Sequence, residues 1–268
     1  MVKYLGSKRV LLPAILDAVE SIPGARTILD LFSGTSRVGH ALKSRGRRVI
    51  ANDHNAYAHT LATCYIQADA EAHARAAELL ITELNRIAAT TPAPAAPDPF
   101  TQTYCLDSRF FHPDNGPRIF AVREAIRLKH LQPELESVLL TSLLEAADRV
   151  DSTTGLQMAY LKSWAPRALR PLELRLPRLL PRAEAGKGLA INLDALAAAQ
   201  QWGPRADIAY IDPPYNQHSY LGNYHIWESL VRWDFPPVYG RACKREDVRT
   251  RTSPFNSRRT CLAALRDL

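Results

Sequence analysis

The stretch Thr27-Ile28-Leu29-Asp30-Leu31-Phe32-Ser33-Gly34-Thr35-Ser36 decides the fold of this chain. Its first six residues are mostly apolar, which is typical of a parallel-sheet strand that is buried on both faces. A tight turn follows, and residues 37–44 then have the pattern of a helix that ends at Gly46. A strand, a glycine-containing loop and a helix in this order indicate an α/β protein.

A second strand is predicted over residues 48–53 and ends in the acid Asp53. An acidic residue about twenty positions after such a loop commonly binds the ribose hydroxyls of a nucleoside cofactor. Asp53 follows Gly34 by 19 residues. The loop lacks the G-x-G-x-x-G pattern, so the motif indicates a nucleoside cofactor without indicating a dinucleotide.

The N-terminal stretch Lys3-Tyr4-Leu5-Gly6-Ser7-Lys8 contains two cations and an aromatic ring beside a Gly-Ser turn. Gly6 permits tight backbone geometry. A helix is predicted over residues 10–21, and its first N–H groups would lie near this loop. The loop could close over a charged small molecule. The alternative is an unstructured basic terminus.

A third motif, Ala209-Tyr210-Ile211-Asp212-Pro213-Pro214-Tyr215-Asn216, has the pattern of a buried apolar strand that breaks at two prolines. Asp212 and Tyr215 would then lie at the carboxyl edge of the sheet, where ligands bind in open α/β folds. The Asp212 carboxylate and the Pro213 carbonyl accept hydrogen bonds, and Tyr215 offers a flat ring. An exocyclic amino group on a planar base needs this set. The alternative is a strand followed by a simple Pro-Pro turn.

The alternation of strands and helices continues along the chain. Helical patterns occupy residues 55–89, 117–130 and 133–149, and a further strand and helix occupy 188–194 and 195–201. We therefore expect a doubly wound α/β core formed by residues 1–62 and 186–268, with a mostly helical insertion at 63–185. In such a core the strands at 28–31 and 209–212 must be neighbours, because their active-site edges must meet.

The amino-acid composition indicates which classes of molecule this chain can bind. The 268 residues carry a formal net charge of +7 with a pI near 9.4, which suits a polyanion such as nucleic acid. No apolar run reaches membrane-spanning length, and the N-terminus lacks a signal-peptide pattern. The four cysteines lack metal-type spacing and are interpreted as reduced cytosolic thiols. We expect neither a membrane nor a metal as a partner.

A proline-interrupted basic segment lies between residues 160 and 182. Basic side chains for phosphates, with aromatic rings among them, are typical of a nucleic-acid contact surface. The alternative is a solvated irregular loop. A second basic segment covers residues 241–259. The candidate DNA-binding residues are Lys162, Arg167, Arg170 and Arg175.

Taken in order, these motifs resemble those of the D12-class, Dam-like DNA adenine-N6 methyltransferases, from the first residues to about Arg259. The resemblance implies a Rossmann-like core that binds S-adenosyl-L-methionine. Residues 3–8 are similar to the N-terminal cofactor motif, and residues 30–34 to the motif around the methionine part. The implied cofactor-binding residues are Tyr4, Lys8, Asp30, Phe32, Gly34, Asp53 for the ribose and Asp194 for the adenine. The implied catalytic residues are Asp212, Pro213 and Tyr215.

The resemblance also implies an activity, which is site-specific methyl transfer from S-adenosylmethionine to N6 of adenine in double-stranded DNA. Residues 145–171 and 224–230 are most similar to the branch of type IIS modification enzymes of the FokI kind. A cytoplasmic, nucleoid-associated prokaryotic enzyme is expected, with a cognate restriction endonuclease as a candidate partner. Residues 63–185 are the expected target-recognition region.

Two departures from the family pattern bear on this expectation. Ser36 stands where many members have a second glycine, so the loop is expected to lie slightly further from the cofactor. The chain ends at Leu268. Family members continue with strands that carry a Ser-Tyr-Asn-like or Ser-Phe-Asn-like segment, so one side of the sheet is expected to be missing.

Other functions stay open on the sequence. One alternative is a truncated, catalytically silent DNA-binding remnant. Another is methylation of RNA or of a protein glutamine, although such enzymes usually carry Asn or Ser before the prolines or lack the loop at 3–8. Cytosine-N4 methylation usually goes with Ser in place of Asp212.

Overall fold

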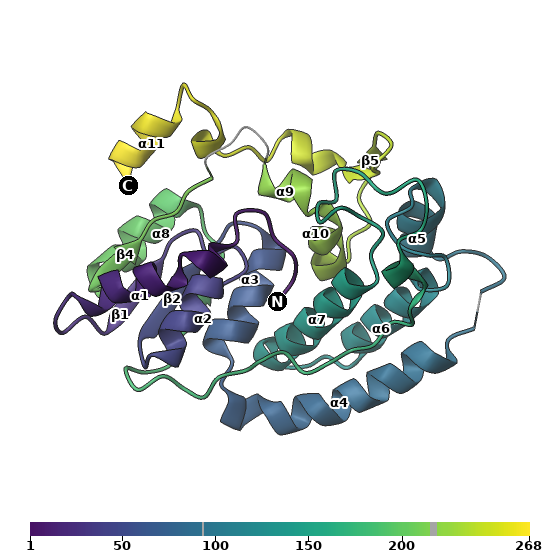
Figure 1. The fold of residues 1–268 in the computed structure, drawn as a ribbon, viewed down its shortest axis with the longest axis horizontal. Coiled ribbons are helices and arrows are strands. Elements are labelled where there is room, and N and C mark those ends of the chain that lie inside the picture. The colour runs from purple at the N-terminus through teal and green to yellow at the C-terminus, as the bar shows by residue number, and fades with distance from the viewer. Residues whose placement is uncertain (93, 215–218) are drawn as a thin grey trace.

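The computed structural model describes residues 1–92, 94–214 and 219–268, and Figure 1 shows a sheet on one side of the molecule and a group of helices on the other. The sheet of the described residues has the strand order β3 (Leu189–Ile191), β2 (Arg48–Asn52), β1 (Thr27–Asp30) and β4 (Ile208–Tyr210). Every pairing in it is parallel. The predicted α/β class with a parallel sheet is confirmed.

The predicted neighbourhood of the two motif-bearing strands is also confirmed. β1 pairs with β4 in the register Ile28↔Ile208 and Asp30↔Tyr210. Beyond the last pair, the Leu31 N–H donates to the Tyr210 carbonyl at 3.1 Å. The glycine-containing loop after β1 and the prolines after β4 therefore begin side by side at the carboxyl edge of the sheet.

The helices and short elements occupy the rest of the chain (Figure 1). The helices are α1 (Leu12–Glu20), α2 (Arg37–Ser44), α3 (Ala56–Ala62), α4 (Ala70–Thr90), α5 (Pro99–Thr101), α6 (Gly116–Leu128), α7 (Pro133–Arg149), α8 (Ala195–Trp202), α9 (Tyr220–Asn223), α10 (His225–Arg232) and α11 (Cys261–Asp267). Two π-helical turns are η2 (Thr63–Gln67) and η3 (Gln102–Asp107), and an antiparallel hairpin is formed by β5 (Val238–Tyr239) and β6 (Lys244–Arg245).

Successive side chains of the central strands point to opposite faces of the sheet, as strand geometry requires. On one face, Ile28 and Val49 belong to the same buried cluster as Leu42 of α2. On the other face, Leu29 and Ile50 form a buried cluster with residues of α8. The sheet thus has helices on both faces, and the loops at its carboxyl edge are held by two packed layers.

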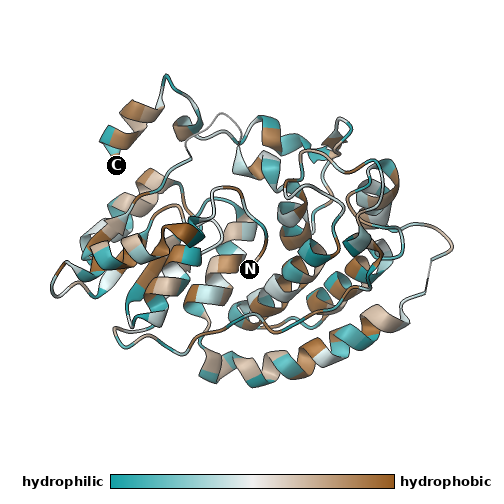
Figure 2. Ribbon diagram, in the orientation of Figure 1, coloured by the Kyte–Doolittle hydropathy of each residue, from teal (hydrophilic) through white to brown (hydrophobic). Residues whose placement is uncertain are grey.

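Residues 63–149 contain helices and π-helical turns but no strand among the described residues. The long helix α4 packs on α6 and α7. Figure 2 shows apolar and polar residues alternating along α4, in which Ile81 and Leu84 are buried and Leu79 is exposed. Within the described part of the chain, no helix combines the length and the apolar character needed to cross a membrane.

The expected burial of the strand before the two prolines is wrong. β4 is an edge strand and is not buried: Ala209 is exposed, and Ile211 just beyond it is 45% exposed. The reason is its place in the sheet, because β4 pairs with β1 on one side and with no described strand on the other. An apolar composition predicts burial only where neighbours cover the strand.

Candidate functional site

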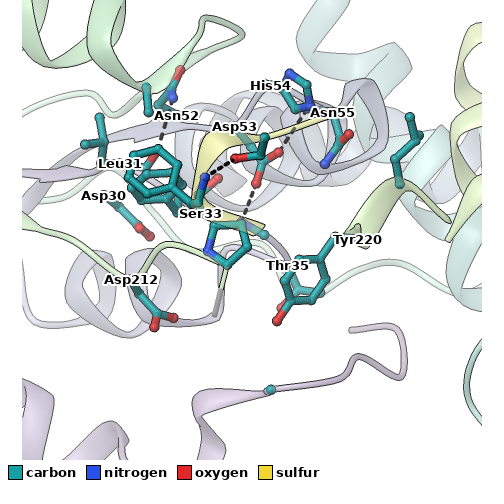
Figure 3. A pocket seen from close by; sticks show the side chains of 18 of the residues that line it. Asp30, Leu31, Ser33, Thr35, Asn52, Asp53, His54, Asn55, Asp212 and Tyr220 are labelled. Carbon is teal, nitrogen blue, oxygen red and sulfur yellow. Dashed lines mark hydrogen bonds between the residues drawn. The ribbon is translucent and has the colours of Figure 1, made fainter. Parts of the chain in front are cut away.

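A pocket opens at the carboxyl edge of the sheet, where three acidic residues from three strands meet (Figure 3). Asp30 ends β1, Asp53 follows β2 and Asp212 follows β4. The structure brings nearly all the residues expected in the site into the lining of this one pocket: Tyr4, Lys8, Asp30, Phe32, Gly34, Asp53, Asp194 and Asp212. Pro213 follows Asp212 directly, and Tyr215 lies outside the described residues.

The Asp53 carboxylate is oriented by two backbone donors. The N–H of Gly34 donates to Oδ2 at 3.0 Å, and the N–H of Asn55 donates to Oδ1 at 2.9 Å. Burial raises the pKa of Asp53, while these two hydrogen bonds lower it. Gly34 has a φ of +51°, and a Cβ there would lie 3.3 Å from the ring of Tyr4. Glycine therefore permits both the turn and the close approach of the N-terminal loop.

Asp30 is 1% exposed and faces the same pocket. Neither of its carboxylate oxygens has a hydrogen-bond partner of normal geometry among the described residues. Burial, with the charges of Asp53 and Asp212, raises the pKa of Asp30 to about 7, against an opposing effect of the Gly39 N–H. A buried carboxylate without a partner is costly, so this position suits a cationic group of a ligand.

Lys8 contacts the Asp-Pro-Pro motif that follows β4. Its Nζ lies 2.8 Å from Asp212 Oδ2, and the side chains are 17% and 30% exposed. The N-terminal loop is therefore tied to the residue that follows β4. The predicted Lys-Tyr-Leu-Gly-Ser-Lys loop is an ordered part of the site and not an unstructured terminus.

Tyr4 is the middle ring of a stack. Its centroid lies 5.1 Å from that of Tyr220 and 4.6 Å from that of Tyr224, with nearly parallel planes. Its hydroxyl shares a hydrogen bond with the Tyr57 hydroxyl at 3.1 Å. The stack joins the N-terminal loop to α9 and α10, the elements that follow the Pro-Pro motif.

Asp194 and Phe32 also have structural partners. The Asp194 side chain caps α8 by accepting from the Leu196 N–H at 2.9 Å. The Phe32 ring makes an edge-to-face contact with Phe255, with centroids 5.1 Å apart. Both residues line the pocket while serving the fold.

Sequence reasoning missed part of the lining. Tyr220 and all of residues 251–256 line the pocket. Residues 251–256 lie in the segment 241–259, which the sequence identifies only as basic. The available signal was the pair Pro254-Phe255, because a buried aromatic ring is unusual in a solvated basic tail. His225 is fully buried and bonded to the Gln157 carbonyl at 2.9 Å.

The candidate DNA-binding residues have different surroundings. Lys162 and Arg170 are exposed. Arg167 Nε donates to Asp151 Oδ1 at 2.8 Å, and Asp151 also accepts from Lys3 Nζ at 2.9 Å. The fourth residue, Arg175, pairs with Glu173 on the surface. None of the four lines the pocket.

The pocket of the described residues is lined by four aspartates, Asp30, Asp53, Asp194 and Asp212, and by the cations Lys8, Arg37 and Arg251. Such a mixed lining suits a ligand that carries charges of both signs. No cluster of three or more His, Cys, Asp or Glu side chains in the described ranges is placed to hold a metal ion.

Comparison with known proteins agrees with this geometry. A family model described as D12 class N6 adenine-specific DNA methyltransferase matches residues 4–259. The chain is 32% identical over 260 residues to the type II methyltransferase M.NlaIII of Neisseria lactamica, which covers 92% of this chain and 74% of that protein. No solved structure matches the chain significantly.

Two further relatives are longer. The type II methyltransferase M.FokI of Planomicrobium okeanokoites is 29% identical over 269 residues, covering 93% of this chain and 40% of the relative. The modification methylase StsI of Streptococcus sanguinis is 29% identical over 283 residues, covering 99% and 41%. The chain therefore spans about two fifths of the length of these two relatives.

Proposed function

Because the chain belongs to the D12 class of N6 adenine-specific DNA methyltransferases, we propose that its pocket binds S-adenosylmethionine and that Asp212 receives the amino group of a target adenine. The observation that carries the proposal is the convergence of Asp30, Asp53 and Asp212 at one edge of the sheet. A doubly wound, Rossmann-like core is the arrangement that would bring them together, because ligands of such sheets bind at the carboxyl edge.

The residues present fit the cofactor, which when bound supplies an electrophilic methyl group on a sulfonium. Asp53 would accept hydrogen bonds from the ribose hydroxyls, because Gly34 and Asn55 already orient its carboxylate. The carboxylate of Asp30, which lacks a described partner, would compensate the ammonium group of the methionine part. Phe32 would complete the site beside the methionine part, and Asp194 on the side of the cofactor adenine.

Asp212 would activate the amino group of the target adenine by accepting a hydrogen bond from it. The lone pair of the adenine amino group is conjugated with the ring, which makes it a poor nucleophile. Hydrogen bonds from its two protons to the Asp212 carboxylate and the Pro213 carbonyl favour a pyramidal nitrogen. They also stabilise the positive charge that develops on that nitrogen, which lowers the transition state relative to the ground state.

The target adenine must leave the duplex to reach this pocket, which costs a few kcal/mol. Tyr215, outside the described residues, is the proposed stacking surface, and such stacking returns about 1–3 kcal/mol per base. Residues 63–185 are the proposed target-recognition insertion. Within it, Lys162, Arg170 and Arg175 would contact phosphates, while Arg167 would have to share its guanidinium with Asp151.

The proposed cellular location is where the DNA substrate lies. The enzyme would work in the prokaryotic cytoplasm, associated with the nucleoid. M.FokI and StsI are named as a type II methyltransferase and a modification methylase. A cognate restriction endonuclease is therefore the proposed partner of the methylation activity.

The test of the proposed function is product analysis. The chain is incubated with S-adenosylmethionine carrying a labelled methyl group and with unmethylated duplex DNA, and the nucleosides are separated after digestion. We expect label in N6-methyladenine and none in N4-methylcytosine. A matched RNA substrate distinguishes the RNA alternative, because label in RNA with none in DNA would contradict the proposal.

A further inference from the structure

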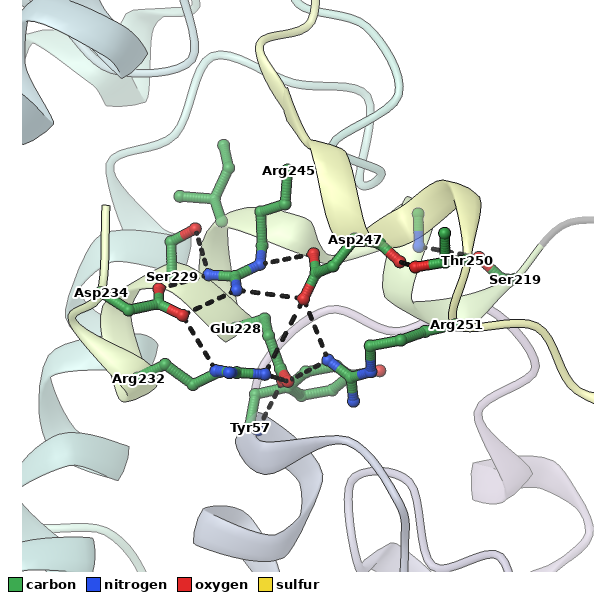
Figure 4. Close-up of polar contacts among 12 residues, drawn as sticks. Tyr57, Ser219, Glu228, Ser229, Arg232, Asp234, Arg245, Asp247, Thr250 and Arg251 are labelled. Carbon is green, nitrogen blue, oxygen red and sulfur yellow. Dashed lines mark hydrogen bonds and ion pairs between the residues drawn. The ribbon is translucent and has the colours of Figure 1, made fainter. Parts of the chain in front are cut away.

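A network of alternating charges joins α10 to the segment that follows the β5–β6 hairpin (Figure 4). Arg245 is 1% exposed and forms a two-pronged ion pair with Asp234 through bonds of 2.6 and 2.8 Å. It also donates to Asp247 at 3.1 and 3.2 Å and to Ser229 Oγ at 3.2 Å. A guanidinium held in this way fixes orientation as well as distance. The segment from Glu246 onward thus starts from a fixed point on α10.

Glu228 is the innermost member of the network, with a fully buried side chain. Its Oε2 accepts from the Tyr57 N–H of α3 at 3.1 Å, and its Oε1 accepts from Arg251 Nη1 at 2.8 Å. The next cation, Arg232, has its Nη1 at 3.9 Å from the same oxygen. Arg251 is therefore the principal counter-charge of the buried Glu228 carboxylate. Removing one partner of a buried ion pair strongly destabilises a protein, because it leaves a buried charge without compensation.

Arg251 also extends to the candidate cofactor site. Its Nη2 donates to the carbonyl of His54 at 3.2 Å, and His54 directly follows Asp53. Residues 251–256, here called the pocket wall, all line the pocket. One guanidinium therefore connects the pocket wall, the buried carboxylate of α10 and the loop that presents the proposed ribose acceptor.

The pocket wall has a second, apolar attachment. Phe255 is 7% exposed and contacts the Phe32 ring. It belongs to the buried cluster that contains Leu29 and Ile50 of the sheet. The Phe255 contact holds the far end of the pocket wall against the sheet. Of these two attachments, the one through Arg251 also includes a hydrogen bond to the backbone of His54, beside Asp53.

We propose that Arg251 is a positioning residue of the cofactor site. Its ion pair with Glu228 holds the pocket wall in place, and its bond to the His54 carbonyl holds the loop that orients Asp53. This inference rests on the proposed function, because it takes a nucleoside cofactor as the occupant of the pocket. Both bonds need the fork of a guanidinium, and a lysine at this position could replace the charge but not the geometry.

The test compares Arg251→Lys with Arg249→Lys. Arg249 belongs to the same basic segment, is 57% exposed, pairs with Glu246 on the surface and does not line the pocket. Two quantities are measured: the dissociation constant of S-adenosylhomocysteine by calorimetry, and amide hydrogen exchange of the ligand-free protein. The second readout depends neither on the cofactor nor on activity.

We expect Arg251→Lys to weaken S-adenosylhomocysteine binding about tenfold or more, as for a lost hydrogen bond to a charged group. Exchange should become faster in residues 250–257 and stay unchanged in β1 and β2. At saturating S-adenosylmethionine the turnover rate of Arg251→Lys should remain near that of the parent, because weaker cofactor binding raises KM and leaves the chemical step unchanged. Arg249→Lys should match the parent in every measurement.

The inference is overturned if Arg251→Lys folds, binds S-adenosylhomocysteine like the parent and exchanges residues 250–257 at the parental rate. Glu228→Gln provides the reciprocal variant, which keeps the side-chain shape and removes the charge, and it should reproduce both effects. A parent protein that binds no S-adenosylhomocysteine would contradict the proposed function instead. The exchange comparison would still decide whether Arg251 holds the pocket wall.

Discussion

Lys8 and Asp212 form an ion pair, with Nζ and Oδ2 2.8 Å apart, that joins the N-terminal loop to the end of β4. The two residues come from motifs with separate proposed roles, one in holding the cofactor and one in catalysis. Because the pair is partly shielded from water, the ammonium group can orient the carboxylate that the target amino group must meet. The proposed sites of cofactor binding and of catalysis are thus joined by this ion pair.

Replacing Lys8 by Met should therefore impair chemistry more than DNA binding. The carboxylate of Asp212 would lose its orienting partner, and misplacement of a catalytic group by about 1 Å can cost about 10²-fold in rate. We expect single-turnover methylation to slow about tenfold or more, with affinity for duplex DNA within about twofold of the parent. Lys8→Arg should retain more activity than Lys8→Met. A Lys8→Met protein with the parental rate would refute the role of the pair.

Asp53→Ala should weaken cofactor binding with little effect on DNA binding. The variant loses a charged acceptor for the ribose hydroxyls, which is worth about 1.5–3 kcal/mol. Calorimetry with S-adenosylhomocysteine measures this loss. Asp17→Ala is the matched control, because Asp17 is an exposed acid on α1 outside the pocket lining. Unchanged affinity in Asp53→Ala would remove the ribose assignment.

Asp30 should make cofactor affinity depend on pH. Its pKa in the folded protein is about 7, above the ordinary value of 3.8, so much of it is protonated below neutral pH. A cationic cofactor favours the carboxylate form, and affinity should rise about fivefold to tenfold between pH 6 and 7.5. Asp30→Asn should bind more weakly at pH 7.5 and lose most of this dependence. A parent affinity that is flat over this range would contradict the contact.

The same carboxyl group sets a second trend of opposite sign. Between about pH 4 and 7 the folded state holds a proton on Asp30 that the unfolded state has released. The contribution of Asp30 to the free energy of unfolding of the ligand-free protein should therefore fall as pH rises through this window. Urea unfolding at each pH should show the parent losing stability relative to Asp30→Asn as pH rises.

Ser36 should be a site of backbone strain. It has a φ of +58° and ψ of +23°, is fully buried, and its hydroxyl has no partner among the described residues. A left-handed conformation costs a residue other than glycine about 1–2 kcal/mol. Urea unfolding should show Ser36→Gly to be more stable than Ser36→Ala by about 1 kcal/mol, since only glycine relieves the backbone. Equal stabilities would show that this turn is not strained.

Local patterns predicted the elements around the pocket well. The helices expected at 37–44 and 133–149 coincide with α2 and α7, because apolar periodicity and end signals are properties of neighbouring residues. The convergence of Asp30, Asp53 and Asp212 also followed from sequence, since each acid ends an apolar strand in a recognisable motif. Ser36, which stands where many family members have a glycine, has φ > 0 in this structure.

Features set by distant residues were not predictable in this way. The pairing of Arg251 with Glu228 joins two charges whose local surroundings give no sign of one another, so the sequence shows Arg251 only as part of the basic segment 241–259. The ion pair of Arg167 with Asp151 was not predictable for the same reason. The exposure of β4 depends on which strands flank it, and the two-residue strands of the β5–β6 hairpin are too short to show a period.

Single-turnover methylation of duplex DNA by Asp212→Ala, beside the parent and Asp17→Ala, tests whether Asp212 accepts a hydrogen bond from the adenine amino group during methyl transfer. We expect N6-methyladenine from the parent and from Asp17→Ala at similar rates. For Asp212→Ala we expect a rate lower by about 10²–10³, as for loss of a preorganised group that stabilises developing charge, with S-adenosylhomocysteine still bound. Formation of N6-methyladenine by Asp212→Ala at the parental rate would contradict this role of Asp212.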